Sequence, residues 1–377
     1  MQNWVSARFP KLLQDLPFRR YWVGQGLSLT GDQVRILAIP LTAVLVLHAG
    51  AAAVALLSAV GMLPSLLFSV SLGAWVDRRG RRREAMLLAD IGRALLVLCI
   101  PAAYLLGSLS LPLLIAVSFL IGTCSVLFRV SSSTLFVSLV PKDAYVEAGA
   151  LLSGARSFAF LVGPGIAGYL IQLLQAPLAL AADGLSFVAS ALSLAAIRPE
   201  EPAPAPRERR HVSAGLRFIR TSPVLRASLA AQATMSLFQG VLFALFILYA
   251  TRDLHVTPVE WGIILGPSSL GALAASALAG RISRRVGLGR TLLLGTILFT
   301  VPYLLVPLSG GPHPLVVATL FCAEVFGGAG SMISEVANGT IQAAAIPSAL
   351  RARVTAAFST VGTFGRWERS SAGYSER

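Results

Sequence analysis

Long apolar stretches dominate the sequence, and short polar or basic segments separate them. Ten stretches are long enough to cross a bilayer, which requires about 20 apolar residues per helix. Each is predicted to be an α-helix, because a spanning segment must satisfy its backbone hydrogen bonds without water. The predicted spans cover residues 22–47, 51–76, 85–107, 111–136, 147–173, 176–197, 227–250, 260–280, 291–309 and 314–340.

An eleventh apolar stretch is much shorter than the others. It begins near Val354 and stops at Gly365, after about twelve residues, which is too few to cross a bilayer. The chain then continues as the polar segment RWERSSAGYSER over residues 366–377. We therefore predict an all-α polytopic membrane protein with ten complete spans and a partial eleventh.

Composition supports a membrane protein and excludes other classes. Hydrophobic residues make up 55% of the chain and charged residues 13%, whereas soluble domains carry about 25% charged residues. These values exclude a soluble enzyme and a disordered chain. Cys99, Cys124 and Cys322 lie inside apolar stretches without metal-site or disulfide spacing, so we expect neither feature.

The net charge of +14 would indicate nucleic acid in a soluble protein, but the positions of the charges give it another meaning. With the N-terminus in the cytoplasm, 23 Lys and Arg residues fall in cytoplasmic segments, and Arg252 falls in a connection on the opposite side. Such asymmetry is typical of membrane topology. We expect a cytoplasmic N-terminus, a lipid bilayer as surroundings and no nucleic-acid partner.

A segment of different composition divides the chain. Residues 199–211 read PEEPAPAPRERRH, and a Pro/Ala/charged segment of this kind is typical of a linker. The predicted organisation is a six-helix half over 1–198, a cytoplasmic linker over 199–222, an incomplete second half over 223–365 and a polar tail over 366–377.

The two halves share a short repeat in equivalent loops. GAWVDRRGRRR follows the second span and GRISRRVGLGR follows the eighth; a shift of 207 residues places Gly73 on Gly280. The same shift places Asp77 on Arg284, so the second loop lacks the acid. Repeats between halves are a hallmark of secondary transporters, whose substrate site lies near the bilayer midplane between them.

The first of these loops resembles motif A of the major facilitator superfamily, written G-x-L-a-D-r-x-G-r-r. The matching positions are Gly73, Asp77, Arg78, Gly80 and Arg81. The glycines are expected to allow close packing and a tight turn, and the acid is expected to latch one conformation by pairing with the other half. The resemblance implies the major facilitator fold of two pseudo-symmetric halves with twelve spans, so we expect the C-terminus to be truncated.

The fifth span carries a second motif. FLVGPGIAGYL resembles the antiporter motif of that superfamily through Gly163, Pro164 and Gly168, and Arg156 precedes it on the same helix. A dinucleotide fingerprint is excluded because the string lies within an apolar span. Proline bends a helix and glycine permits close packing, so a generic kink is the alternative. Further strings resemble proton-coupled drug and siderophore exporters of the enterobactin type, which implies export.

Charged residues inside the spans are candidates for the transport site, since each costs about 2.5–3.5 kcal/mol on insertion scales. Asp32 and Arg35 lie three residues apart on one face of the first span, and Asp32 is expected to bind a proton or a cationic substrate. A self-satisfied structural pair is the alternative. Glu324 in the tenth span is the candidate coupling carboxylate of the second half.

Asp90 and Arg93 repeat the same spacing at the cytoplasmic end of the third span. We expect them to lie close enough to the surface to be latch partners of the motif A loop, with simple snorkelling as the alternative. They complete the predicted conformational gate.

Three more charges lie inside spans. Arg129 and Arg156 are expected to pair with carboxylates such as Asp77 or Glu147, although either could line the transport path. Asp183 is expected near the outer surface.

Together with the resemblance, these features predict a monomeric secondary transporter of the bacterial plasma (inner) membrane. It would export small amphipathic, drug-like or siderophore-like compounds in exchange for protons, by alternating access. The proton gradient would supply the energy, with no cofactor, no metal and no enzymatic activity. An uptake permease and an inactive truncated transporter are the alternatives.

Overall fold

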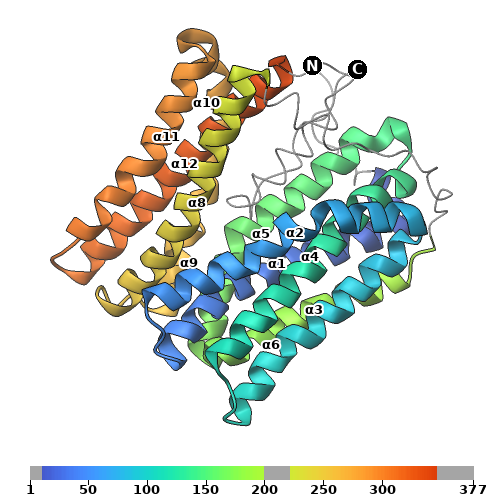
Figure 1. Cartoon of the computed structure of the whole chain (residues 1–377), viewed down its shortest axis with the longest axis horizontal. Coiled ribbons are helices and arrows are strands. Elements are labelled where there is room, and N and C mark those ends of the chain that lie inside the picture. The colour runs from blue at the N-terminus through green and yellow to red at the C-terminus, as the bar shows by residue number, and fades with distance from the viewer. Residues whose placement is uncertain (1–10, 199–220, 346–377) are drawn as a thin grey trace, which may run out of the picture.

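The computed structural model describes residues 11–198 and 221–345, which form helices and no β-strand (Figure 1). The first half contains α1 (Leu16–Leu41), α2 (Ala51–Arg79), α3 (Arg82–Leu105), α4 (Leu111–Leu139), α5 (Tyr145–Leu174) and α6 (Ala176–Ala195). The second half contains α8 (Pro223–Arg252), α9 (Pro258–Leu265), α10 (Ser268–Val286), α11 (Leu288–Leu304) and α12 (His313–Ala345). Short 3₁₀ or π turns cover Lys11–Gln14, Thr42–Val46, Lys142–Ala144 and Val306–Leu308.

The helices confirm the all-α membrane fold. Within the described residues, nine helical segments are long and apolar enough to cross a membrane. The remaining predicted span, 227–250, lies inside α8, which is helical over 30 residues. The partial eleventh span, the polar tail and nearly all of the linker lie outside the described residues.

The eighth predicted span consists of two helices. α9 ends at Leu265 and α10 begins at Ser268, with Gly266 and Pro267 between them. Proline has no backbone N–H, so the helical hydrogen-bond ladder is interrupted at this point. The two pieces together still form one apolar segment over Pro258–Val286.

Local sequence sets several helix ends. The Asp15 carboxylate accepts a hydrogen bond from the N–H of Phe18 at 3.0 Å and caps the start of α1. Thr257 and Glu260 form a reciprocal capping box at the start of α9. Gly80 ends α2 with φ 68, a left-handed conformation that glycine adopts without strain, as expected for the tight turn of the motif A loop.

The first half is an open ring of helices. Following the packing, α5 lies on α1, α1 on α6, α6 on α3, α3 on α4, and α4 on α2. The ring therefore opens between α2 and α5. In the second half α12 packs against both α10 and α11.

The two halves contact each other at one end, which we call the closed end. It contains the connections 47–50 and 253–257. There α5 packs on α9 and α2 packs on α8, and one hydrophobic cluster includes Ala167 of the first half and Trp261 of the second. Arg252 donates a hydrogen bond from Nη2 to the carbonyl of Ala49 at 2.9 Å across the same junction.

The halves diverge toward the opposite end, where α6 ends and α8 begins (Figure 1). We call this the linker end. Here the described hydrophobic clusters belong to single halves: one surrounds Phe18 and Met86, and another surrounds Ala279 and Ile333. Because α2 and α5 contact the second half, the opening of the first-half ring faces that half.

Candidate functional site

A cluster of charged side chains lies between α1, α3 and α6 in the first half. We call it the Arg35 cluster; its members are Asp32, Arg35, Asp90, Arg93 and Asp183. Arg35 forms an ion pair with Asp32 on its own helix, and its Nε lies 3.2 Å from Oδ2 of Asp183 on α6. Asp183 is fully buried, the Arg35 side chain is 8% exposed and that of Asp32 is 21% exposed. Arg35 thus forms ion pairs with both Asp32 and Asp183.

The second pair of this cluster is buried as well. Asp90 and Arg93 form an ion pair on α3, and the guanidinium of Arg93 lies between the rings of Phe128 and Phe187, 4.1 and 4.2 Å from their centres. The exposed fractions are 0% for Asp90 and 3% for Arg93. The pair is therefore enclosed within the bundle and does not snorkel into solvent, because α4 and α6 pack over this side of α3; its role as a latch partner stays a prediction.

The two pairs act on each other electrostatically. Asp183 interacts with Arg93 as well as with Arg35, and Asp90 interacts with Asp32. The cluster therefore holds three carboxylates and two guanidinium groups. If all five groups are ionised, one negative charge is in excess within an apolar bundle, where an uncompensated charge is strongly unfavourable. A bound proton or a cationic group would restore neutrality.

The structure also corrects the expected position of Asp183. This residue does not lie near the outer surface; it lies inside the bundle, because α6 packs along α1 and brings it to Arg35. Sequence analysis missed Asp183 as a member of the site. The sequence did contain a signal for it: Asp183 is an acidic residue in the middle of an apolar span, where a charge requires a partner of opposite charge.

Glu324, the candidate carboxylate of the second half, lies on α12. Its side chain is buried, and Tyr303 of α11 donates a hydrogen bond to its Oε1 at 2.8 Å. The Tyr303 ring lies 5.9 Å from the ring of Phe246 and 5.4 Å from that of Phe299. The structure thus places Glu324 in the other half from the Arg35 cluster, and its coupling role stays a prediction.

The motif A residues lie at the linker end, on α2 and the turn after it. Arg78 donates to the carbonyl of Ala74 at 2.9 Å, and Arg81 forms an exposed ion pair with Glu84 at 3.2 Å. A Cβ at Gly73 would make an ordinary contact with Val130 at 3.7 Å, so this position does not require glycine for packing. The side chain of Asp77 lies outside the described residues, and the latch stays a prediction.

One more arginine of this loop contacts the end of another helix. Arg83 donates to the carbonyls of Leu194 and Ala195 at 2.9 and 2.6 Å. Cationic groups are favourable at a helix C-terminus, where carbonyls lack intrahelical partners. The basic loop therefore holds the linker ends of α3 and α6 together.

The antiporter-like motif of α5 packs on both halves. A Cβ at Gly163 would lie 2.4 Å from Cγ of Gln33 on α1, and one at Gly168 would lie 2.2 Å from the carbonyl oxygen of Pro258 on α9. The predicted tight packing at this motif therefore includes the junction between the halves at the closed end.

Gly168→Ala is expected to lower thermal stability, because overpacking typically costs about 1–3 kcal/mol. The added methyl group would meet backbone atoms of Pro258 and Gly262, which cannot rotate away. The melting temperature of the purified protein measures this effect. Gly165→Ala is the matched control, since its Cβ would meet no atom within 4 Å in the described structure. Equal melting temperatures of the two variants would contradict this packing.

Arg129 and Arg156 do not form the predicted carboxylate pairs with the acids whose side chains are described. Arg129 donates from Nη2 to Oγ of Ser65 at 2.9 Å. Arg156 interacts electrostatically with Tyr21. Glu147 instead accepts a hydrogen bond from the backbone N–H of Leu12 at 3.4 Å.

Comparisons with known proteins agree with this architecture. The family model described as Major Facilitator Superfamily matches residues 21–366. The multidrug efflux pump Tap of Mycolicibacterium fortuitum is 28% identical over 343 residues, which is 86% of this chain and 80% of that protein.

Two solved structures share the fold at low sequence identity. The nucleoside transporter NupG superposes with a TM-score of 0.75 at 11% identity, covering 93% of this chain and 88% of that one. A bacterial homologue of the iron transporter ferroportin superposes with a TM-score of 0.68 at 17% identity, covering 92% and 89%.

Proposed function

Because the chain belongs to the major facilitator superfamily of membrane transporters, we propose that it exports small amphipathic compounds in exchange for protons. Asp32 is the proton-binding group of this proposal. Binding of substrate and binding of the proton alternate at the Arg35 cluster while the halves rock about the closed end.

The observation that carries the proposal is the uneven charge of the Arg35 cluster. Three carboxylates share two arginines, and a charge imbalance inside an apolar bundle calls for a neutralising ligand. Asp32 has the most exposed side chain of the four that form ion pairs on α1 and α3, so it is the carboxylate that a proton or a substrate cation reaches first. Arg35 and Asp183 supply the buried counter-charges.

Two other observations support export as the direction of transport. The relative from Mycolicibacterium fortuitum carries the name of a multidrug efflux pump, and α5 carries the antiporter-like motif. With the N-terminus in the cytoplasm, the linker end is the cytoplasmic end. The described helices of the two halves, which pack together at the closed end, then diverge toward the cytoplasm, from which an exporter takes its substrate (Figure 1).

Everted membrane vesicles from cells that produce the full chain test this proposal. Their lumen corresponds to the outside of the cell, so acidifying the lumen should drive accumulation of fluorescent amphipathic dyes. A protonophore should abolish the accumulation, and vesicles without the chain provide the control. Accumulation driven only in right-side-out vesicles would support an uptake permease instead, and no transport in either orientation would support an inactive chain.

A further inference from the structure

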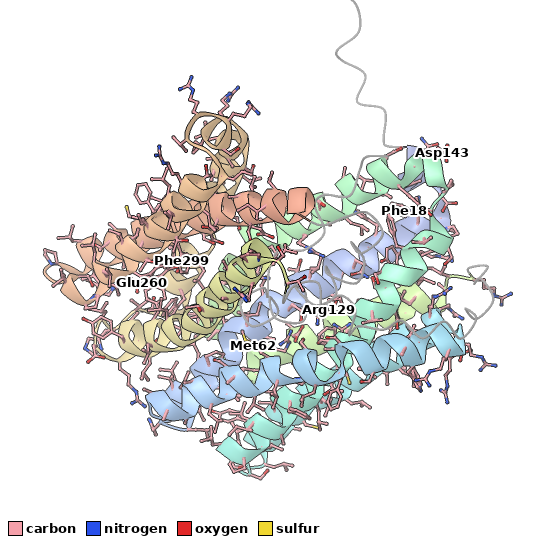
Figure 2. All side chains as sticks on the ribbon, turned by 45° about the horizontal axis from the view of Figure 1, so that its top comes forward. Phe18, Met62, Arg129, Asp143, Glu260 and Phe299 are labelled. Carbon is pink, nitrogen blue, oxygen red and sulfur yellow. The ribbon has the colours of Figure 1, made fainter. Side chains whose placement is uncertain are left out.

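A second group of arginines within the predicted spans lies apart from the Arg35 cluster. Arg129 on α4 and Arg156 on α5 interact with each other electrostatically, although both carry positive charge. Arg129 is exposed and Arg156 is half-buried. Figure 2 shows Arg129 in the middle of the first half.

Uncharged polar groups surround the two arginines. The Ser65 hydroxyl of α2 accepts a hydrogen bond from Arg129, and Tyr21 of α1 lies near Arg156. Tyr21 is hydrogen-bonded to Oγ of Ser132 at 2.7 Å, and Gln25 donates to the same oxygen at 3.0 Å. Within the described part of the chain, these contacts use few of the N–H donors of the two guanidinium groups.

The acids closest in the fold are engaged elsewhere or lie out of reach. Asp32 pairs with Arg35, and Glu147 accepts from the backbone of Leu12. Asp77 lies twelve residues beyond Ser65 on α2, about 18 Å along the helix at 1.5 Å per residue. In the described structure, then, no carboxylate neutralises Arg129 and Arg156.

The location of this pair matches the expected path of a substrate. Arg129, Arg156 and the polar residues around them lie on α1, α2, α4 and α5, the helices on either side of the opening of the first-half ring. This opening faces the second half, and the described halves separate toward the linker end, where their hydrophobic clusters are distinct. An arginine pair without a counter-charge at this place is suited to hold an anionic group, because the planar guanidinium binds carboxylate and phosphate oxygens in a bidentate manner.

We propose that Arg129 and Arg156 bind an acidic group of the transported compound, so that the substrates are zwitterionic amphipathic molecules. This inference rests on the proposed function and names its substrate class. Gln25 and Asp32 are seven residues apart on one face of α1, about 10 Å along the helix. A molecule of that length places its acidic group on the two arginines and its amino group at Asp32, where it displaces the proton.

Binding of two matched dyes to the purified full chain tests the proposal. One is a rhodamine with a free carboxylate and an amino-substituted ring system; the other is its methyl ester, which differs only in lacking the negative charge. Fluorescence polarisation without a proton gradient measures both affinities. We expect the wild type to bind the acid at least about tenfold more tightly than the ester, because charge-assisted bidentate bonds are lost in the ester.

The Arg129→Gln/Arg156→Gln variant should bind both dyes equally, while the Arg129→Lys/Arg156→Lys variant should keep part of the preference because it keeps the charge. The melting temperature without ligand provides a second measurement. It should not fall in the glutamine variant, since this change removes repulsion between like charges. The proposal is wrong if the wild type binds neither dye or binds both equally, if the glutamine variant keeps the preference, or if that variant unfolds while the lysine variant stays folded.

The same experiment separates this inference from the proposed function. Asp32→Asn should keep the preference for the acid, because the acidic group binds at the arginines. If the wild-type chain prefers the acid but shows no proton-driven transport, the result supports the anion site and contradicts the proposed exporter function. If the chain exports the ester in a proton-driven manner but shows no preference for the acid, the result supports the exporter function and contradicts the anion site.

Discussion

Asp32→Asn should reduce proton-driven accumulation of dye in everted vesicles by at least about tenfold, to the level seen without a gradient. Asparagine keeps the size and part of the hydrogen bonding of aspartate, but it cannot take up or release a proton. Exchange of dye down its own concentration gradient should persist, because that process does not require proton transfer. Loss of gradient-driven transport with retained exchange is the specific result expected of a coupling residue.

Glu84→Gln is the matched control for this variant. It makes the same chemical change at a carboxylate whose side chain is 55% exposed and which pairs with Arg81 at the linker end. Its transport should be close to that of the wild type. If Asp32→Asn kept full proton-driven accumulation, Asp32 would be one half of a structural pair with Arg35, and the proposed coupling mechanism would be wrong.

Arg35→Met should have the largest effect on stability. It removes the cation shared by Asp32 and Asp183, and Asp183 is fully buried. Removing one partner of a buried ion pair costs about 3–5 kcal/mol, because the other charge stays buried without compensation. We expect a strong fall in the amount of folded protein recovered from membranes and in its melting temperature.

A second substitution should partly reverse this loss. In Arg35→Met/Asp183→Asn the fully buried charge is gone together with its partner, so the double variant should be more stable than Arg35→Met alone. Arg81→Met is the control; it breaks an ion pair with exposed side chains, which typically contributes about 0–1 kcal/mol. Failure of Asp183→Asn to improve stability would show that Arg35 acts through packing and not through charge.

The sequence predicted the helices well because each membrane span requires a long apolar stretch. The break at Gly266 and Pro267 was missed, because the apolar stretch continues across it on both sides. Helix ends beyond the bilayer were also missed: α8 begins at Pro223, capped by Ser222, four residues before the predicted span. Hydrophobicity reports burial in lipid and carries little information about where a helix stops in water.

Charged pairs within one helix could be predicted from their spacing, but pairs between helices could not. Asp32 and Arg35 are three residues apart, and that spacing alone places them on one face. Asp183 meets Arg35 only through the packing of α6 on α1, which the order of helices along the chain does not reveal. For the same reason, the sequence could not show that Arg156 lies near Tyr21, on the adjacent α1, or that Glu147, one of its expected partners, accepts a hydrogen bond from the backbone of Leu12 instead.

The most direct test of the exchange mechanism is a measurement of protons released when substrate binds. The purified full chain would be held in a weakly buffered detergent solution with a pH-sensitive dye, and the free-acid rhodamine would be added in steps. We predict that wild-type protein releases protons in proportion to the bound dye, and that Asp32→Asn binds the dye without releasing them. Binding without proton release in the wild type, or equal release from Asp32→Asn, would contradict the proposal that substrate and proton exchange at Asp32.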